Sequence, residues 1–195
     1  PRQLQIQVRF KGPTDSAWQT PIALSEPTHN AADPVVAFVG PNATPLVAWV
    51  ENTLTAAEAT ALGQDFNALL LRQEIVYRLY VNGRWQPAVR LTNDHFADGL
   101  PALAGSTAGA ILAWTRDRDD NAFSRDDQRI AVSLFDLTTG QFGPLTLLDE
   151  SVAGLHGDVQ VAYDSAVSPA QPYVAWVHDA DADLITSDDR RLAVA

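Results

Sequence analysis

Three short segments of this chain carry nearly the same sequence, in which apolar residues lead into Ala-Trp. They are residues 46–50, 111–115 and 173–177. Their tryptophans, Trp49, Trp114 and Trp176, are 65 and 62 residues apart. Self-similarity at a nearly constant spacing is typical of repeat proteins, in which each unit buries its apolar faces against its neighbours. This repeat constrains the fold more than any other feature of the sequence.

Alignment on the tryptophans brings four strand-like segments of each unit into register, named A to D in chain order. Segment A covers 34–37, 101–104 and 159–162; segment B carries the tryptophan; segment C covers 4–10, 75–80, 130–135 and 191–195; segment D covers 18–24, 85–91 and 142–148. Asn82-Gly83 between C and D is a strong hairpin signal. A four-stranded antiparallel unit with an aromatic marker is typical of a β-propeller blade. A β-sandwich is the alternative, but it gives no reason for the unit to recur.

We therefore predict an all-β chain, a β-propeller of four-stranded antiparallel blades with about three blade-equivalents. The predicted boundaries are 1–28 (strands C and D), 29–94, 95–150, and 151–195 (strands A, B and part of C). Propellers typically close with four to eight blades, so this ring is incomplete. The expected partners are the remaining blades of the same protein or a second copy of the chain. A C strand at both ends favours the first.

One segment departs from the repeat. Residues 55–74, between B and C of the 29–94 unit, are rich in Ala, Leu, Gln and Glu, with apolar residues at helical spacing. We expect one helix, or two short helices divided at Gly63. The insertion would pack on the rim of the sheets, or act as a lid or docking element.

Composition narrows the classes of partner. The net charge is −11, and clustered Lys and Arg are scarce, which argues against nucleic acid. No apolar run approaches the roughly 18 residues that span a bilayer, so membrane insertion is not expected. The chain has no cysteine and therefore no disulfide. An acidic, cysteine-free, Thr/Ala/Asp-rich chain is typical of a bacterial secreted or cell-surface protein.

Two Asp-rich segments follow strand B at the same offset from the tryptophan. Their oxygen-bearing residues are Asp117, Asp119, Asn121 and Asp126 in the first, and Asp179, Asp181, Asp183 and Asp188 in the second. Oxygen ligands at alternate positions with a carboxylate downstream can wrap Ca²⁺, which takes six to eight oxygens. The loops lack the glycine and the final glutamate of an EF-hand. The alternative is a solvated acidic turn paired with nearby arginines.

A histidine followed by an aspartate recurs before each A segment. The pairs are His29 with Asp33, His95 with Asp98, and His156 with Asp158. Such a set at a propeller mouth could bind a metal or a ligand. The spacing within the pairs drifts from four to two residues, which favours a structural role in which the carboxylate caps backbone amides.

The repeated pattern resembles the sialidase-like (BNR-type) propeller repeats of large bacterial extracellular proteins. The pattern is clearest in 83–91, 114–135 and 176–192. This resemblance implies a propeller, secretion, and a binding or adhesive role within a multidomain protein. The Asp-box, Ser-x-Asp-x-Gly-x-Thr-Trp, is absent, and the sialidase active site has no recognisable counterpart here.

The sequence contains none of the common nucleophile or phosphate-binding motifs. We therefore expect a non-catalytic extracellular module that binds carbohydrate or a surface protein, or that has a structural role, with Ca²⁺ as its cofactor. The alternative is a carbohydrate-active hydrolase or lyase with its active site at the propeller mouth.

Overall fold

The chain folds mostly into β-strands, with 53% of residues in strands and 6% in helices. The computed structural model describes residues 4–124, 127–148, 155–179 and 191–195. Within these residues the strands form several antiparallel sheets, none of which closes into a barrel. No helix in the described part is long and apolar enough to cross a membrane. The prediction of an all-β chain is confirmed at this level.

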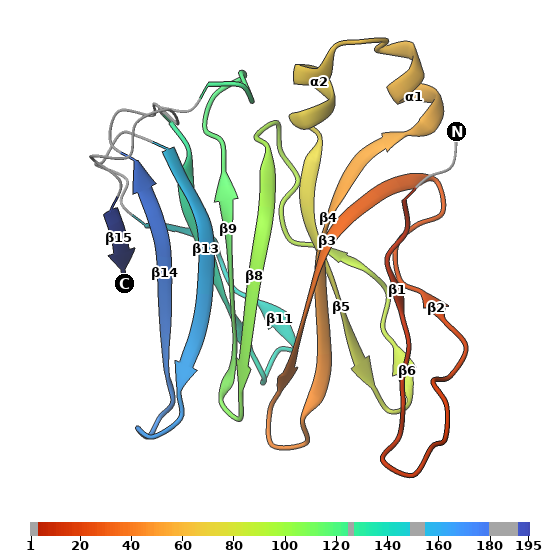
Figure 1. Ribbon diagram of the computed structural model, residues 1–195, viewed down its shortest axis with the longest axis vertical. Helices are drawn as coiled ribbons and strands as arrows, with labels where there is room; N and C mark the ends of the chain where they lie inside the picture. The colour runs from red at the N-terminus through yellow and green to blue at the C-terminus, as the bar shows by residue number, and fades with distance from the viewer. Residues whose placement is uncertain (1–3, 125–126, 149–154, 180–190) are drawn as a thin grey trace.

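The sheets follow one another along the chain and lie side by side (Figure 1). An N-terminal ribbon pairs β1 (Gln7–Val8) with β2 (Ile22–Ala23). The first sheet contains β3 (His29–Val39), β4 (Thr44–Thr55), β5 (Gln73–Val81), β6 (Arg84–Trp85) and β7 (Val89–Arg90). The second contains β8 (Asp98–Ser106), β9 (Gly109–Arg116), β10 (Arg129–Asp136), β11 (Gln141–Phe142) and β12 (Thr146–Leu148). The third contains β13 (Leu155–Asp164), β14 (Gln171–Asp179) and β15 (Arg191–Val194).

The strands of each sheet pair in chain order, as the repeat predicts. The fourth segment of the first two sheets is not one strand, however, because it splits into β6 and β7 in one and β11 and β12 in the other. Pro87 and Pro144 lie in the two gaps. Proline has no N–H to donate to a ladder, so each outer strand is interrupted at its proline.

The inner strand of each sheet contains a β-bulge at an equivalent position. Asp33, Leu100 and Asp158 have φ angles of 51°, 50° and 50°, and each lies at a break in register with the neighbouring strand. Aspartate tolerates this left-handed conformation better than most residues, because its short side chain can bond locally. The residue equivalent to Asp33 and Asp158 is therefore Leu100, in agreement with the alignment that starts segment A at residues 34, 101 and 159, and Asp98 lies two residues before it.

The apolar core is divided into layers between consecutive sheets. Trp49 packs between the first sheet and the N-terminal ribbon, beside Ile6 and Leu24. Trp114 packs among residues of the first and second sheets, and Trp176 among residues of the second and third. Each tryptophan is thus buried against the sheet that precedes its own, which confirms the expectation that they pack between successive units.

The insertion after Trp49 forms two short helices, α1 (Ala56–Ala61) and α2 (Phe66–Leu70), as predicted. Thr55 caps α1 in a capping box with Glu58, whose carboxylate accepts from the Thr55 backbone N–H. Gly63 adopts a φ of 65° between the helices, a conformation that glycine adopts without strain. The helices lie at the end of the first sheet where the loop after β9 also lies (Figure 1).

Candidate metal site

The Asp-rich loop begins where β9 ends, three residues after Trp114. Asp117 donates its backbone N–H to the Ala97 carbonyl at 2.9 Å, which fixes the start of the loop against the segment before β8. In the first sheet the corresponding position is Asn52, the third residue after Trp49. Both side chains accept a hydrogen bond from the backbone two residues on, from Leu54 and from Asp119. Asn52 and Asp117 therefore make the same local hydrogen bond, although Asn52 still lies within β4.

Successive side chains fold the Asp loop around its own backbone. The Asp117 Oδ1 accepts from the Asp119 N–H at 3.2 Å, and the Asp119 Oδ1 accepts from the Asn121 N–H at 2.6 Å. The Asn121 Oδ1 in turn accepts from the Phe123 N–H at 3.3 Å. Because each bond joins a side chain to the backbone two residues on, every second side chain points toward the inside of the loop. A loop with this pattern can gather oxygen ligands on one side.

Asp127 closes the loop at its other end. Its Oδ2 accepts from the Arg118 N–H at 2.9 Å, and its Oδ1 accepts from the Ser124 hydroxyl at 3.1 Å. Asp117, Asp119 and Asp127 each offer a carboxylate oxygen within 4.8 Å of the others. These three residues could hold a metal ion.

Asp117 stands out within this group because its charge is buried. The residue is 4% exposed, and its Oδ2 has no hydrogen-bond partner among the residues that the structure describes. Burial, together with the neighbouring carboxylates of Asp127 and Asp119, raises the pKa of Asp117 to about 7. An uncompensated carboxylate is costly to bury, and a cation between the three carboxylates would remove that cost.

The sequence identified part of this group. Asp117 and Asp119 are in it, while the Asn121 side chain is engaged with the loop backbone. Asp126 lies outside the described residues, and Asp127, which the sequence analysis did not select, is the downstream member. In the third sheet, Asp179 ends β14 and is 2% exposed. Asp181, Asp183 and Asp188 lie outside the described residues.

The helical insertion is fastened to the Asp loop by one side chain. The Asn67 Nδ2 donates to the Asp120 carbonyl at 2.8 Å, and its Oδ1 accepts from the Ala122 N–H at 2.7 Å. Asn67 is the second residue of α2 and lies 53 residues from Asp120 in the chain. These two bonds connect the first and second sheets at the end where the candidate metal site lies. No motif in the sequence indicates this contact.

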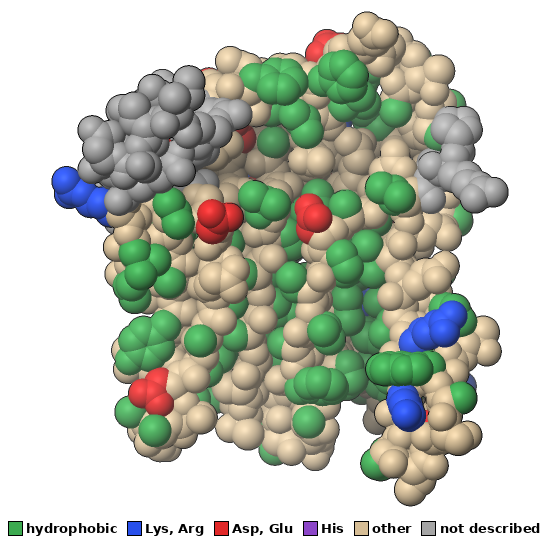
Figure 2. Space-filling view, viewed as in Figure 1, with side chains coloured by type: hydrophobic (Ala, Val, Ile, Leu, Met, Phe, Trp, Pro, Cys, Tyr) green, Lys and Arg blue, Asp and Glu red, His purple; other side chains and the backbone are tan. Residues whose placement is uncertain are grey.

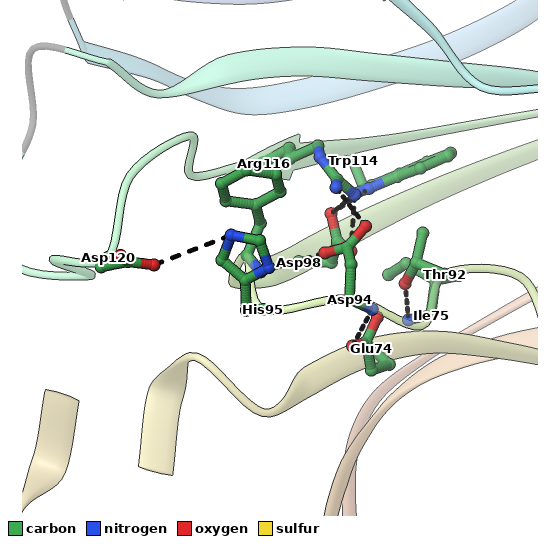
Figure 3. Close-up of polar contacts among 10 residues, drawn as sticks. Glu74, Ile75, Thr92, Asp94, His95, Asp98, Trp114, Arg116 and Asp120 are labelled. Atoms are coloured by element: carbon green, nitrogen blue, oxygen red, sulfur yellow. Dashed lines mark hydrogen bonds and ion pairs between the residues drawn. The ribbon is translucent and has the colours of Figure 1, made fainter. Parts of the chain in front are cut away.

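A second group of carboxylates lies deeper, between the first two sheets (Figure 3). Its members are Glu74, Asp94 and Asp98, which offer oxygens within 4.8 Å of one another. Arg116 lies among them, with its Nη1 3.0 Å from the Asp98 Oδ2 and its Nη2 paired with Asp94. Its guanidinium also stacks 4.9 Å from the centre of the Phe96 ring. This group already contains its own cation, so it is a weaker candidate for a metal ion.

Trp114 belongs to the same network. Its indole Nε1 donates to the Asp98 Oδ1 at 2.7 Å. The Glu74 Oε1 accepts from the Asp94 N–H at 2.8 Å, while its Oε2 has no hydrogen-bond partner in residues 4–124, 127–148, 155–179 and 191–195. Burial raises the pKa of Glu74 to about 7 and that of Asp98 to about 6, despite the nearby Arg116. Both carboxyl groups are buried, with Glu74 1% and Asp98 0% exposed, and each binds a proton more tightly than it would in water.

Two of the three histidines form ion pairs with acidic residues other than the aspartates assigned to them. His29 lies 3.5 Å from a Glu51 carboxylate oxygen, and His95 lies 3.8 Å from an Asp120 oxygen. Asp33 and Asp158 are exposed at the bulges of the inner strands. His156 lies in β13, but its side chain is outside the described part.

The sequence analysis did not identify three residues of this network, Glu74, Asp94 and Arg116. Arg116 lies two residues after Trp114, where the other units have Glu51 and His178. An ionisable residue at this position in every unit was the available signal. In the first sheet Glu51 accepts from the Trp49 Nε1 at 3.3 Å, as Asp98 accepts from the Trp114 Nε1 in the second.

The chain matches no known family model and no curated protein.

Proposed function

We propose that the chain is a segment of an extracellular β-propeller, and that it acts as a non-catalytic binding or structural module whose loop after β9 holds Ca²⁺. The observation that carries this proposal is the Asp117 carboxylate, buried and short of one partner within a ring of three aspartates. Carboxylates and backbone carbonyls are the ligands that Ca²⁺ prefers, and water can complete six to eight positions.

The propeller part of the proposal rests on how the sheets repeat. Three successive sheets have the same antiparallel order, and an equivalent tryptophan of each faces the preceding sheet. In a propeller each blade buries its faces against its neighbours in this manner. A sandwich would instead bury one shared layer between two sheets.

The non-catalytic part rests on the state of the acidic groups. A hydrolase of the paired-carboxylate type needs an acid and a base that reach the substrate. Glu74 and Asp98 have the raised pKa of a general acid, but both are buried, and Arg116 binds Asp98. These groups are better suited to joining the first two sheets than to protonating a ligand.

Calcium titration tests the proposal. Isothermal titration of the metal-free chain with Ca²⁺ is expected to show saturable binding. At 100 times the dissociation constant, the melting temperature is expected to rise by roughly 5–10 °C. Asp117→Asn is expected to abolish both effects, whereas Glu26→Gln removes an exposed carboxylate far along the chain and should preserve them. Equal binding by the Asp117→Asn and Glu26→Gln variants, or none by the wild-type chain, would overturn the calcium proposal.

A further inference from the structure

An apolar groove lies between the N-terminal ribbon and the first sheet. Its volume is about 560 Å³, and its lining includes Val8, Phe10, Val36, Phe38, Val47 and Trp85. Arg9 and Lys11 also line it, and none of the described lining residues carries a carboxylate. Figure 2 shows the molecule hollowed at the lower right, where hydrophobic and basic side chains gather on the ribbon.

Comparison of the three sheets shows that the ribbon leaves part of the β3 face exposed. Val36, Leu103 and Val161 occupy equivalent positions on the inner strands, each paired with the residue two before its tryptophan. Leu103 and Val161 pack against the cores shared with the preceding sheets, but Val36 is 61% exposed. Two residues on, Tyr163 packs in the core between the second and third sheets, whereas Phe38 is 60% exposed.

The other sheets show what normally covers these positions. Leu103 belongs to the core whose residues from the preceding sheet include Leu46 and Ala48 of β4, the second strand of that sheet. Over Val36 the preceding layer is the ribbon, whose buried residues Ile6 and Leu24 flank β1 and β2. β1 and β2 correspond to the third and fourth strands of a sheet. The ribbon therefore has no counterpart of the first and second strands of a sheet, and the groove lies where those two strands would pack.

One edge of β1 is also free to pair with a further strand. In the first and second sheets the third strand pairs with the tryptophan-bearing strand on one side and with the outer strand on the other. Among the described residues, β1 pairs with β2 alone. A strand that adds to the free edge of β1 would gain a backbone ladder as well as apolar contacts.

Building on the propeller proposal, we propose that this groove binds the tryptophan-bearing β-hairpin of a further repeat unit. The hairpin's second strand pairs with β1, and its apolar side chains cover Val36 and Phe38. A second copy of the chain is a poorer occupant, because the tryptophan-bearing strands β4, β9 and β14 are already paired on both edges. The hairpin must come from a unit whose second strand has a free edge.

A labelled synthetic hairpin with the sequence of residues 98–116 serves as the probe, because it carries the two inner strands without β10. Fluorescence anisotropy with the full chain is expected to show saturable binding. The variant Val36→Asp/Phe38→Asp is expected to bind at least tenfold more weakly. The matched control, Leu100→Asp/Leu134→Asp, places the same charges on two exposed leucines outside the groove and should bind like the wild type.

Three results would overturn the inference: no binding by a monomeric wild-type chain, equal binding by the groove variant and the control, or dimerisation without peptide that the groove variant abolishes. The last result would assign the groove to a second copy. Calcium titration of the same samples keeps the two proposals separate. A chain that binds Ca²⁺ but not the hairpin would contradict only the docking inference, and a chain that binds the hairpin but not Ca²⁺ would contradict only the metal site.

Discussion

Glu74 is a single buried side chain through which the stability of this protein is expected to depend on pH. It lies in β5, accepts from the Asp94 N–H, and has a carboxylate oxygen near those of Asp94 and Asp98 (Figure 3). Among the described residues, the Arg116 guanidinium forms ion pairs with Asp94 and Asp98 but not with Glu74. The burial of Glu74 and the neighbouring charges of Asp98 and Asp94 favour its protonated form.

We predict that Glu74 makes the protein less stable as pH rises. Its pKa is about 7 in the folded chain, above the ordinary value of 4.5, so the folded state binds the proton more tightly than the unfolded state. The free energy of unfolding therefore falls between about pH 4.5 and pH 7. Glu74→Gln should flatten this fall, and at pH 8 it should stabilise the chain by roughly 1–3 kcal/mol. Chemical denaturation across this pH range measures it. A variant with the wild-type slope would show that Glu74 does not titrate in this window.

Trp114 supports a second prediction at this scale. Phenylalanine would fill most of its volume but would leave the Asp98 Oδ1 without the indole N–H. We expect Trp114→Phe to lower the free energy of unfolding by roughly 1–3 kcal/mol, since Asp98 is fully buried. Trp176→Phe is the comparison, because Trp176 is 2% exposed but its Nε1 has no hydrogen-bond partner within the described part of the chain. Equal losses in the two variants would mean that the hydrogen bond contributes nothing.

At the level of elements, sequence periodicity was enough to place most strands. The repeated Ala-Trp segment predicted β4 and β9, and alignment on its tryptophan placed β5 and β10. The apolar runs of β4 and β9 are continuous because most of their side chains are buried on both faces. The division of the outer strands was not predicted, although Pro87 and Pro144 were visible signals. The bulges of the inner strands were not predicted either, because a local shift in register, as in β8, is not visible in residue spacing.

The candidate site was predictable only in part, for a related reason. Asp117 and Asp119 could be identified because their spacing is local. Asp127 was harder, since either of two adjacent aspartates could end the loop. Glu74 and Arg116 are brought together by the packing of two sheets, and Asn67 reaches the loop from a helix 53 residues away. Contacts of this kind depend on tertiary structure that a single sequence does not reveal.

The contact between α2 and the Asp loop supports a prediction about elements. Asn67→Ala removes both bonds to the loop, so the α2 segment should open more often. Hydrogen exchange is expected to speed up at the Leu69 and Leu71 amides, which bond within this segment, and Ca²⁺ affinity should fall. Asn93→Ala, which removes an exposed amide bonded to Arg90, is the control. Unchanged exchange in the Asn67 variant would mean that the two Asn67 hydrogen bonds do not stabilise α2.

Over the whole molecule, the close approach of β3 and β8 determines how two sheets fit together. A Cβ at Gly105 would lie 2.1 Å from the Phe38 carbonyl oxygen, so a larger residue must push the inner strands apart. Gly105→Ala is expected to lower the free energy of unfolding by roughly 1–3 kcal/mol or more. Gly99 lies in the same strand, and a Cβ there would meet only Thr115 at 3.7 Å. Thermal unfolding of the two alanine variants should separate them clearly, and equal melting temperatures would contradict this packing.

The central claim is that the loop after β9 holds a hard cation among Asp117, Asp119 and Asp127. Anomalous diffraction from crystals of the chain soaked with Tb³⁺, which substitutes for Ca²⁺, tests it most directly. The account predicts one strong anomalous peak within coordination distance of the three carboxylates, and its absence from Asp117→Asn crystals treated in the same way. A wild-type crystal with no peak at this loop, or with its strongest peak among Glu74, Asp94 and Asp98, would contradict the account.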